Sequence, residues 1–247
     1  MNDRDQPAGR MQGYFVTGTD TGVGKTLIAA GLLRAAADLG LRAVGLKPVA
    51  AGCIPGPDGS PVNEDALELR AAASISIGIE TVNPFVFAEP IAPHIAADRS
   101  GRQIRRDDLV RHCRSVCQDY APQWVVVEGA GGWAVPLNAT ETMADFCAEL
   151  DFPVIIVVGM RLGCLNHALL TARAVLGTGL AVAGWVANCT APDMDAFDEN
   201  LQTLRERLPA PLLGVVPFLG ENATADRAAD CLRLDQLDGY LLTGAGV

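Results

Sequence analysis

One segment restricts the possible folds of this chain more than any other, namely Gly18-Thr-Asp-Thr-Gly-Val-Gly-Lys-Thr26. It joins an apolar run at residues 14–17 to a segment at 25–39 whose apolar residues recur with helical spacing. Glycines allow positive φ angles, so that backbone N–H groups can converge on phosphate oxygens. The N-terminus of the following helix adds about half a positive charge. A strand, this loop and a helix together predict a phosphate-binding loop for a nucleotide.

The loop also supplies two side chains suited to nucleotide chemistry. Lys25 is expected to bridge the β- and γ-phosphates, and the Thr26 hydroxyl is a suitable Mg²⁺ ligand. The strict pattern G-x-x-x-x-G-K-[ST] requires glycine where this chain has Thr19; Gly18 lies one residue earlier, which makes the loop one residue longer. A glycine-rich turn with an accidental Gly-Lys-Thr is the alternative, and the flanking strand and helix argue against it. The nucleotide-binding candidates of the loop are Thr19, Asp20, Gly22, Val23, Gly24, Lys25 and Thr26.

Strands and helices alternate along the rest of the chain. Its 247 residues, of which 49% are hydrophobic and 19% charged, suit one large α/β domain with a sizeable core. We expect a mostly parallel sheet with helices on both faces, of P-loop NTPase type, in a single domain over residues 13–247. The expected strands are residues 14–17, 43–47, 124–128, 154–158, 182–187 and 212–216, and the expected helices are residues 25–39, 64–73, 105–120, 143–150, 165–176 and 197–208.

Four stretches carry no clear periodicity. Residues 1–12 are polar, lack the apolar region of a secretory signal, and are expected to form a disordered extension. Residues 52–63 predict a polar loop, and residues 83–101, which contain three prolines, predict an irregular segment. Long irregular segments inside compact domains are often functional. After residue 216 the chain is expected to be weakly helical or irregular.

Charge and cysteine content exclude several classes of protein. The chain has 19 basic and 29 acidic residues and a formal net charge of −10, so we expect neither nucleic acid nor a membrane as a partner. Its seven cysteines show no paired C-x-x-C spacing, which indicates neither a zinc site nor a disulfide framework. Free thiols favour a reducing compartment, and we expect a cytoplasmic protein.

Three charged residues lie where a parallel sheet presents its ligand site. Lys47 ends an expected strand, and a lysine at that edge can neutralise a transferring phosphoryl group. Glu128 ends the buried run before Gly129-Ala-Gly-Gly132 and is placed to hold Mg²⁺ directly or through water. The alternatives are a solvated lysine and a strand-end acid without a ligand. Asp65 fits a metal ligand and a helix N-terminal acid equally well.

Three further positions suggest ligand contacts. Asn188 follows an expected strand, and its amide matches adenine N6 and N7. Guanine would favour an acidic side chain, which residues 188–191 do not contain, so we expect ATP rather than GTP. Gly163-Cys-Leu-Asn166 precedes a helix and can offer N–H groups to a substrate carboxylate, although an ordinary helix cap fits better without further support. Gly131 lies in a turn that would let a substrate approach the backbone.

The motifs, taken in order from about residue 13 to 220, resemble the dethiobiotin synthetase family. A phosphate loop alone is common to many families, whereas this ordered set is far more discriminating. The matching segments are Tyr14-Phe-Val-Thr-Gly-Thr-Asp-Thr21, Gly24-Lys-Thr26, Lys47-Pro-Val49, Val82-Asn-Pro-Phe85, Phe87-Ala-Glu-Pro90, Pro93-His94, Val127-Glu-Gly-Ala-Gly-Gly-Trp133, Leu162-Gly-Cys-Leu-Asn-His167, Gly184-Trp-Val-Ala-Asn188 and Pro209 to Gly214.

The resemblance implies an ATP- and Mg²⁺-dependent ligase that forms C–N bonds in biotin biosynthesis. CO₂ adds to one amine of 7,8-diaminononanoate and gives a carbamate. The carbamate oxygen attacks the γ-phosphate, which yields a carbamic–phosphoric anhydride and ADP. The neighbouring amine then attacks the carbonyl and expels phosphate, which closes the ring of dethiobiotin. This chemistry requires mainly positioning and charge neutralisation from the protein.

The resemblance also implies roles for individual residues and a homodimer. The substrate carboxylate would be received by the helix start of the neighbouring subunit. The implied catalytic residues are Lys25, Lys47 and Thr21, and the implied metal ligands are Thr26, Asp65 and Glu128. The implied ATP contacts outside the loop are Glu128, Asn188 and Pro217, and the implied substrate contacts are Lys47, Ala51, Gly131, Cys164, Leu165 and Asn166.

Two departures from the family pattern concern the substrate more than the reaction. Gly22 occupies a position that can be glutamate in relatives, and Ala51 lies where some relatives carry a substrate-contacting serine. Loss of that hydroxyl removes at most one hydrogen bond, about 1 kcal/mol.

Two other classes of protein with a phosphate loop fit this chain less well. An amidotransferase-like synthetase would need an ammonia-producing domain, for which this chain has no room. A partitioning ATPase often carries an early lysine in the loop, where this chain has Asp20.

Overall fold

The computed structural model describes residues 11–56 and 59–237. Its central sheet has six parallel strands in the order β10-β9-β8-β1-β7-β2. β1, the strand before the phosphate loop, therefore lies in the middle of the sheet, between β8 and β7. The strands in that order are Leu212–Val216, Val182–Cys189, Val154–Met160, Gln12–Gly18, Trp124–Glu128 and Ala43–Leu46.

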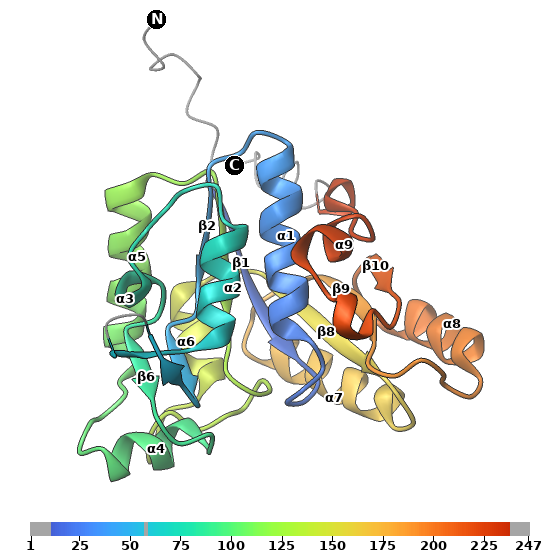
Figure 1. Ribbon diagram of the computed structural model, residues 1–247. Helices are drawn as coiled ribbons and strands as arrows, with labels where there is room; N and C mark the ends of the chain where they lie inside the picture. The colour runs from blue at the N-terminus through green and yellow to red at the C-terminus, as the bar shows by residue number, and fades with distance from the viewer. Residues whose placement is uncertain (1–10, 57–58, 238–247) are drawn as a thin grey trace, which may run out of the picture.

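Helices cover both faces of this sheet (Figure 1). α1 (Lys25–Asp38), α2 (Glu64–Ala72) and the short α9 (Ala225–Ala229) lie in front in that view. The opposite face is covered mainly by four helices, which are α5 (Arg106–Tyr120), α6 (Met143–Leu150), α7 (Cys164–Gly177) and α8 (Phe197–Arg207).

The buried strands explain why the sheet needs a helix layer on each side. Successive side chains of a strand point to opposite faces. Along β1, Tyr14 and Val16 belong to the core beneath α1, whereas Phe15 belongs to the core on the other side. β8 alternates in the same way, and every residue of β7 and β8 is buried. The expected α/β fold with a mostly parallel, doubly covered sheet is thus confirmed.

All strands and helices expected from the sequence are present, and their ends differ by no more than two residues. The expected extension over residues 1–12 lies outside the described residues up to residue 10, and Gln12 already belongs to β1. Of the C-terminal segment, residues 238–247 also lie outside the described part.

The expectation of irregular chain at residues 52–63 and 83–101 was wrong in part. The first stretch contains the antiparallel pair β4 (Ile54–Pro55) and β5 (Pro61–Val62). The second contains β6 (Phe85–Phe87) and α4 (Pro93–Arg99), and β6 pairs in parallel with β3 (Val49–Ala51). A short helix, α3 (Ile79–Val82), was not expected either. These elements are too short to show a sequence period, and their strands exist only through pairing with distant segments.

No helix among the described residues is long and apolar enough to cross a membrane.

Candidate active site

The phosphate loop leaves the end of β1 and enters α1 at Lys25. Gly22 and Gly24 have φ angles of 72° and 84°, a left-handed conformation that favours glycine. The loop begins with a hydrogen bond from the Thr19 N–H to the Val157 carbonyl (3.0 Å), and Val23 is buried against β8. The backbone therefore has the conformation expected of a phosphate loop despite the extra residue.

Lys25 and Asp20 make hydrogen bonds that hold the phosphate loop in its conformation. Lys25 is buried, and its Nζ donates to the Asp20 carbonyl at 3.1 Å. Burial, followed by the charge of Lys47, lowers the pKa of Lys25. The Asp20 carboxylate accepts a hydrogen bond from the Thr21 N–H (2.7 Å) and pairs with Arg161, which follows β8. Asp20 thus fixes both Lys25 and the backbone of the loop.

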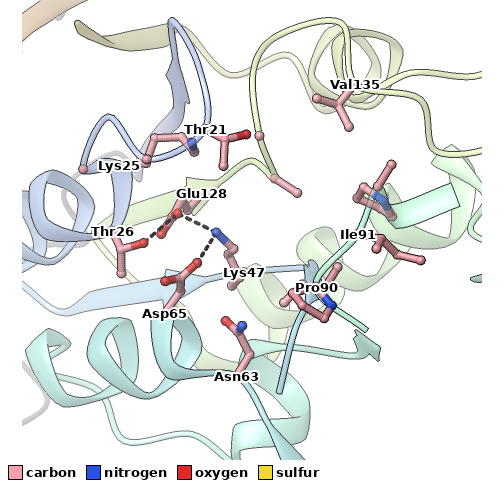
Figure 2. Close-up of a pocket in the computed structure, with 18 residues that line it drawn as sticks. Thr21, Lys25, Thr26, Lys47, Asn63, Asp65, Pro90, Ile91, Glu128 and Val135 are labelled. Atoms are coloured by element: carbon pink, nitrogen blue, oxygen red, sulfur yellow. Dashed lines mark hydrogen bonds and ion pairs between the residues drawn. The ribbon is translucent and has the colours of Figure 1, made fainter. Parts of the chain in front are cut away.

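Lys47 lies between two carboxylates at the carboxyl edge of the sheet (Figure 2). Its Nζ is 2.5 Å from Glu128 Oε1 and 2.8 Å from Asp65 Oδ2. The Thr26 hydroxyl donates to the same Glu128 oxygen at 3.0 Å. Lys47 and Glu128 are 4% and 1% exposed, so Lys47 is not a solvated strand-end lysine. Four elements, the start of α1, the end of β2, α2 and β7, meet at this cluster.

Asp65 proves to be both a helix-start acid and a member of the cluster. The helix α2 is capped by Asn63, whose side chain accepts from the Ala66 N–H, and Asp65 lies in the first turn. Burial alone raises the pKa of Asp65, but the charge of Lys47 and hydrogen bonds from Lys47 and Thr26 outweigh it and lower the pKa.

Burial and pairing shift the pKa values of both Lys47 and Glu128. Burial by itself lowers the pKa of Lys47, but Glu128 and Asp65 outweigh this effect and raise the pKa above the usual value for lysine. Burial raises the pKa of Glu128, although Lys47 opposes that shift. Two charges removed from water stabilise each other only when they stay together, so loss of either one leaves an unpaired buried charge.

The oxygen atoms of this cluster fit Mg²⁺. Thr26, Asp65 and Glu128 offer a hydroxyl and two carboxylates, and the buried Glu128 Oε2 has no hydrogen-bond partner among the described residues. No group of three or more His, Cys, Asp and Glu able to hold a metal exists in the described part of the chain. Mg²⁺ usually keeps several of its water ligands and is bound by one or two carboxylates together with the phosphates of a substrate, so a set with only two carboxylates suits it.

A cavity of about 780 Å³ opens beside the cluster. One end carries the charged side chains and the phosphate loop. The end of the cavity away from these charges is apolar. Pro90 and Ile91, from the segment before α4, and Val135 lie there (Figure 2). Of the expected substrate contacts, Lys47, Ala51 and Gly131 line this cavity. Cys164, Leu165 and Asn166 do not line it within the same chain.

Asn188 contacts the phosphate loop directly. Its Nδ2 donates to the Val23 carbonyl at 2.8 Å, and the residue is only 4% exposed. A side chain at position 24 would overlap this amide. Asn188 therefore holds the loop in place, a contact that the sequence did not predict.

The comparisons with known proteins agree with this geometry. A family model described as an AAA domain matches residues 12–224. The ATP-dependent dethiobiotin synthetase BioD of Cellvibrio japonicus (strain Ueda107) is 50% identical over 224 residues, which are 91% of this chain and 96% of the relative. The protein of the same name from Pseudomonas aeruginosa (strain PAO1) is 51% identical over 222 residues, which are 89% and 95% of the two chains. This chain belongs to the dethiobiotin synthetase family.

Membership in the dethiobiotin synthetase family confirms the resemblance seen in the motifs. It decides against the amidotransferase-like and partitioning classes. Among solved structures, chloroplast FtsY from Physcomitrella patens has a TM-score of 0.52 and 15% identity, and the match covers 92% of this chain and 68% of FtsY. At that identity the likeness concerns the fold alone.

Sequence reasoning missed several residues that line the cavity of this dethiobiotin synthetase family member. Pro90 and Pro93 belong to quoted family motifs, so their proximity to a site could have been inferred. Asn63 and Val135 carried no signal, because only the packing of α2 and of the turn after β7 brings them to the cavity. The cavity residues that were not expected are Ala50, Asn63, Pro90, Ile91, Ala92, Pro93, Ala130 and Val135.

Proposed function

We propose that this protein is a dethiobiotin synthetase of biotin biosynthesis, which uses ATP, Mg²⁺ and CO₂ to close the cyclic urea of dethiobiotin on 7,8-diaminononanoate. One observation carries the proposal beyond family membership. The buried cluster of Lys47, Asp65 and Glu128 lies at one end of a cavity whose opposite wall is apolar. Such a cavity suits a substrate with amines at one position and a hydrocarbon chain beyond them.

The phosphates of ATP would lie on the loop and the N-terminus of α1. Gly22, Gly24 and the following N–H groups would bind the oxygens, and Lys25 would leave the Asp20 carbonyl for the β- and γ-phosphates. Thr26, Asp65 and Glu128 would hold Mg²⁺, which neutralises charge on the phosphate oxygens when bound.

Lys47 would change partners during the reaction. In the structure its ammonium neutralises Glu128 and Asp65. With those carboxylates engaged by the cation, the ammonium is free to neutralise the transferring phosphoryl group. Its position between loop and cavity supports a contact with both the γ-phosphate and the carbamate that attacks it.

The substrate diamine would lie along the cavity with its chain against the apolar wall. Pro90, Ile91 and Val135 would exclude water from the carbamic–phosphoric anhydride, which hydrolysis would otherwise destroy. Thr21 and Gly131, which line the same cavity, would contact the amine end of the substrate. Ala51 would offer only its methyl group.

A homodimer would complete the site. The backbone N–H groups at Cys164–Asn166 begin α7, where an anion is favoured, yet these residues lie outside the cavity of their own chain. Leu162, directly before this helix, is 98% exposed, and Leu170 and Leu176 are also exposed. In this proposal the second subunit covers these exposed leucines. We therefore assign the substrate carboxylate to Cys164, Leu165 and Asn166 of the second subunit, and place the protein, with its free thiols, in the cytoplasm.

The proposal predicts that phosphate release from ATP requires the diamine, bicarbonate and Mg²⁺ together. Phosphate should appear in step with dethiobiotin, and Lys25→Gln should abolish both while the protein stays folded. ATP turnover at the same rate without diamine would refute a synthetase function.

A further inference from the structure

A second hollow, of about 300 Å³, lies beyond the phosphate loop on the side opposite the main cavity. The sheet order explains its place, because β1 separates β8, β9 and β10 from β7 and β2. The hollow is formed where β8, β9 and β10 end. It is lined by Met160, Cys189, Ala191, Pro192, Asp193, Met194, Phe197, Pro217 and Phe218.

The phosphate loop and the second hollow are connected through Asn188. This residue donates to the Val23 carbonyl of the loop, and the next residue, Cys189, lines the hollow. A nucleotide whose phosphates lie on the loop would extend past Asn188 into this space. The volume and the methionine and phenylalanine side chains suit a flat base held between apolar surfaces.

Among the described residues that line this hollow, Asp193 is the one with a charged side chain. It makes no hydrogen bond or ion pair with any residue in the described part of the chain. An ionised carboxylate only accepts hydrogen bonds, so it selects a base edge that presents N–H groups. Asp193 lies five residues after Asn188 along the chain, and the turn between β9 and α8 brings it to the hollow.

We propose that Asp193 reads the nucleobase and that the enzyme accepts GTP in addition to ATP. The inference rests on the proposed nucleotide site and extends it. Guanine presents N1–H and N2–H side by side, and one carboxylate can accept from both. Adenine presents only its N6 amino group beside the N1 lone pair, which a carboxylate repels. The apolar walls bind either purine, whereas Asp193 contributes more to guanine.

Calorimetric titration with ATP and GTP, in the presence of Mg²⁺ and without diamine, tests this inference. The Kd of the wild-type protein for GTP should lie within about tenfold of its Kd for ATP, because the apolar walls bind either purine. Asp193→Ala should weaken GTP binding by at least about tenfold more than ATP binding, since hydrogen bonds to a charged group are worth about one order of magnitude in affinity. Asp195→Ala is the matched control, because Asp195 is an exposed acid of the same turn that does not line the hollow. This control should leave the ratio of the two affinities unchanged.

Two results would overturn the inference: GTP binding more than about a hundredfold weaker than ATP in the wild type, or an equal effect of Asp193→Ala on both nucleotides. A separate assay of diamine-dependent phosphate release distinguishes this failure from that of the synthetase function. Absence of diamine dependence with either nucleotide would refute the synthetase and leave the binding ratio intact. If the assignment of Asp193 is wrong, Asp193→Ala will leave the ratio of the two affinities unchanged, and ATP-driven ring closure will remain diamine-dependent.

Discussion

The Nζ of Lys47 lies 2.5 Å from Oε1 of Glu128, and both side chains are buried. Asp65 adds a second carboxylate at 2.8 Å from the same nitrogen. The ammonium of Lys47 thus neutralises the carboxylates that we assign to Mg²⁺. Binding of the cation and release of Lys47 toward the phosphates would then be coupled, since both positive charges compete for the same oxygens.

Lys47→Gln should lower kcat of diamine-dependent phosphate release by about a hundredfold or more, because a preorganised positive charge at the transferring phosphoryl group is lost. The amide can still donate to Glu128 but leaves its charge unpaired, so the variant should be less stable than the wild type, and turnover is measured after circular dichroism has shown that it is folded. Without the competing ammonium, the nucleotide-free variant should bind Mn²⁺ more tightly than the wild type, as measured by electron paramagnetic resonance.

Lys25→Gln is the control for this prediction. It also removes a lysine from the site, but the Nζ of Lys25 contacts the Asp20 carbonyl rather than the carboxylates. Its Mn²⁺ affinity should therefore change less. Normal turnover of Lys47→Gln would exclude Lys47 from catalysis, and unchanged Mn²⁺ affinity would contradict the competition between the two cations.

Gly24→Ala should raise the KM for ATP by about tenfold or more, because a methyl group at this position overlaps the amide of Asn188 that fixes the loop. Gly22→Ala is a matched control, since Gly22 also has a positive φ angle but its added Cβ would meet no atom within 4 Å. Its effect should be limited to backbone strain, about 1 kcal/mol. Steady-state kinetics on both variants give the comparison.

Adding Asn188→Ala to Gly24→Ala should recover part of the lost ATP affinity, because the overlap disappears with the amide. Equal KM values for the two glycine variants would show that Asn188 does not determine the loop conformation.

Dimers that combine Lys47→Gln in one subunit with Asn166→Asp in the other should regain activity that neither variant has alone. In such a dimer one site carries both defects and the other carries none, so about half of the wild-type activity is expected. Co-expression with two affinity tags and purification through both gives the mixed dimer. Failure to regain activity, with the dimer intact in sedimentation, would place the complete site within one subunit.

Asp145→Ala should destabilise the fold by about 1 kcal/mol at pH 7, because Asp145 and Thr142 form a capping box at the start of α6. Hydrogen bonds from the Thr142 hydroxyl and N–H lower the pKa of Asp145 below its ordinary value of 3.8. The stabilisation is present above that value and is lost as the pH falls through the lowered pKa. Urea unfolding at several pH values should show the difference from wild type closing at the acid end; a constant difference would argue for a purely steric effect.

The sequence alone determined the phosphate loop, the alternation of strands and helices, and the placement of Lys47 and Glu128 at the ligand edge. These follow from local patterns and from one rule, that parallel strands bring their carboxyl ends to a common edge. The boundaries of β7, α6 and β10 agree with the sequence prediction to the residue, because buried runs and caps are local signals.

Only the tertiary structure decided which residues from distant parts of the chain meet at the ligand edge of the sheet. Asp65 reaches Lys47 because α2 packs beside β2, and Asn188 reaches Val23 because β9 lies beside β8 and β8 beside β1. The apolar wall at Pro90 and the approach of Asp193 to the second hollow likewise depend on how the connecting segments pack. Local sequence carries no information on strand order, and these contacts follow from that order.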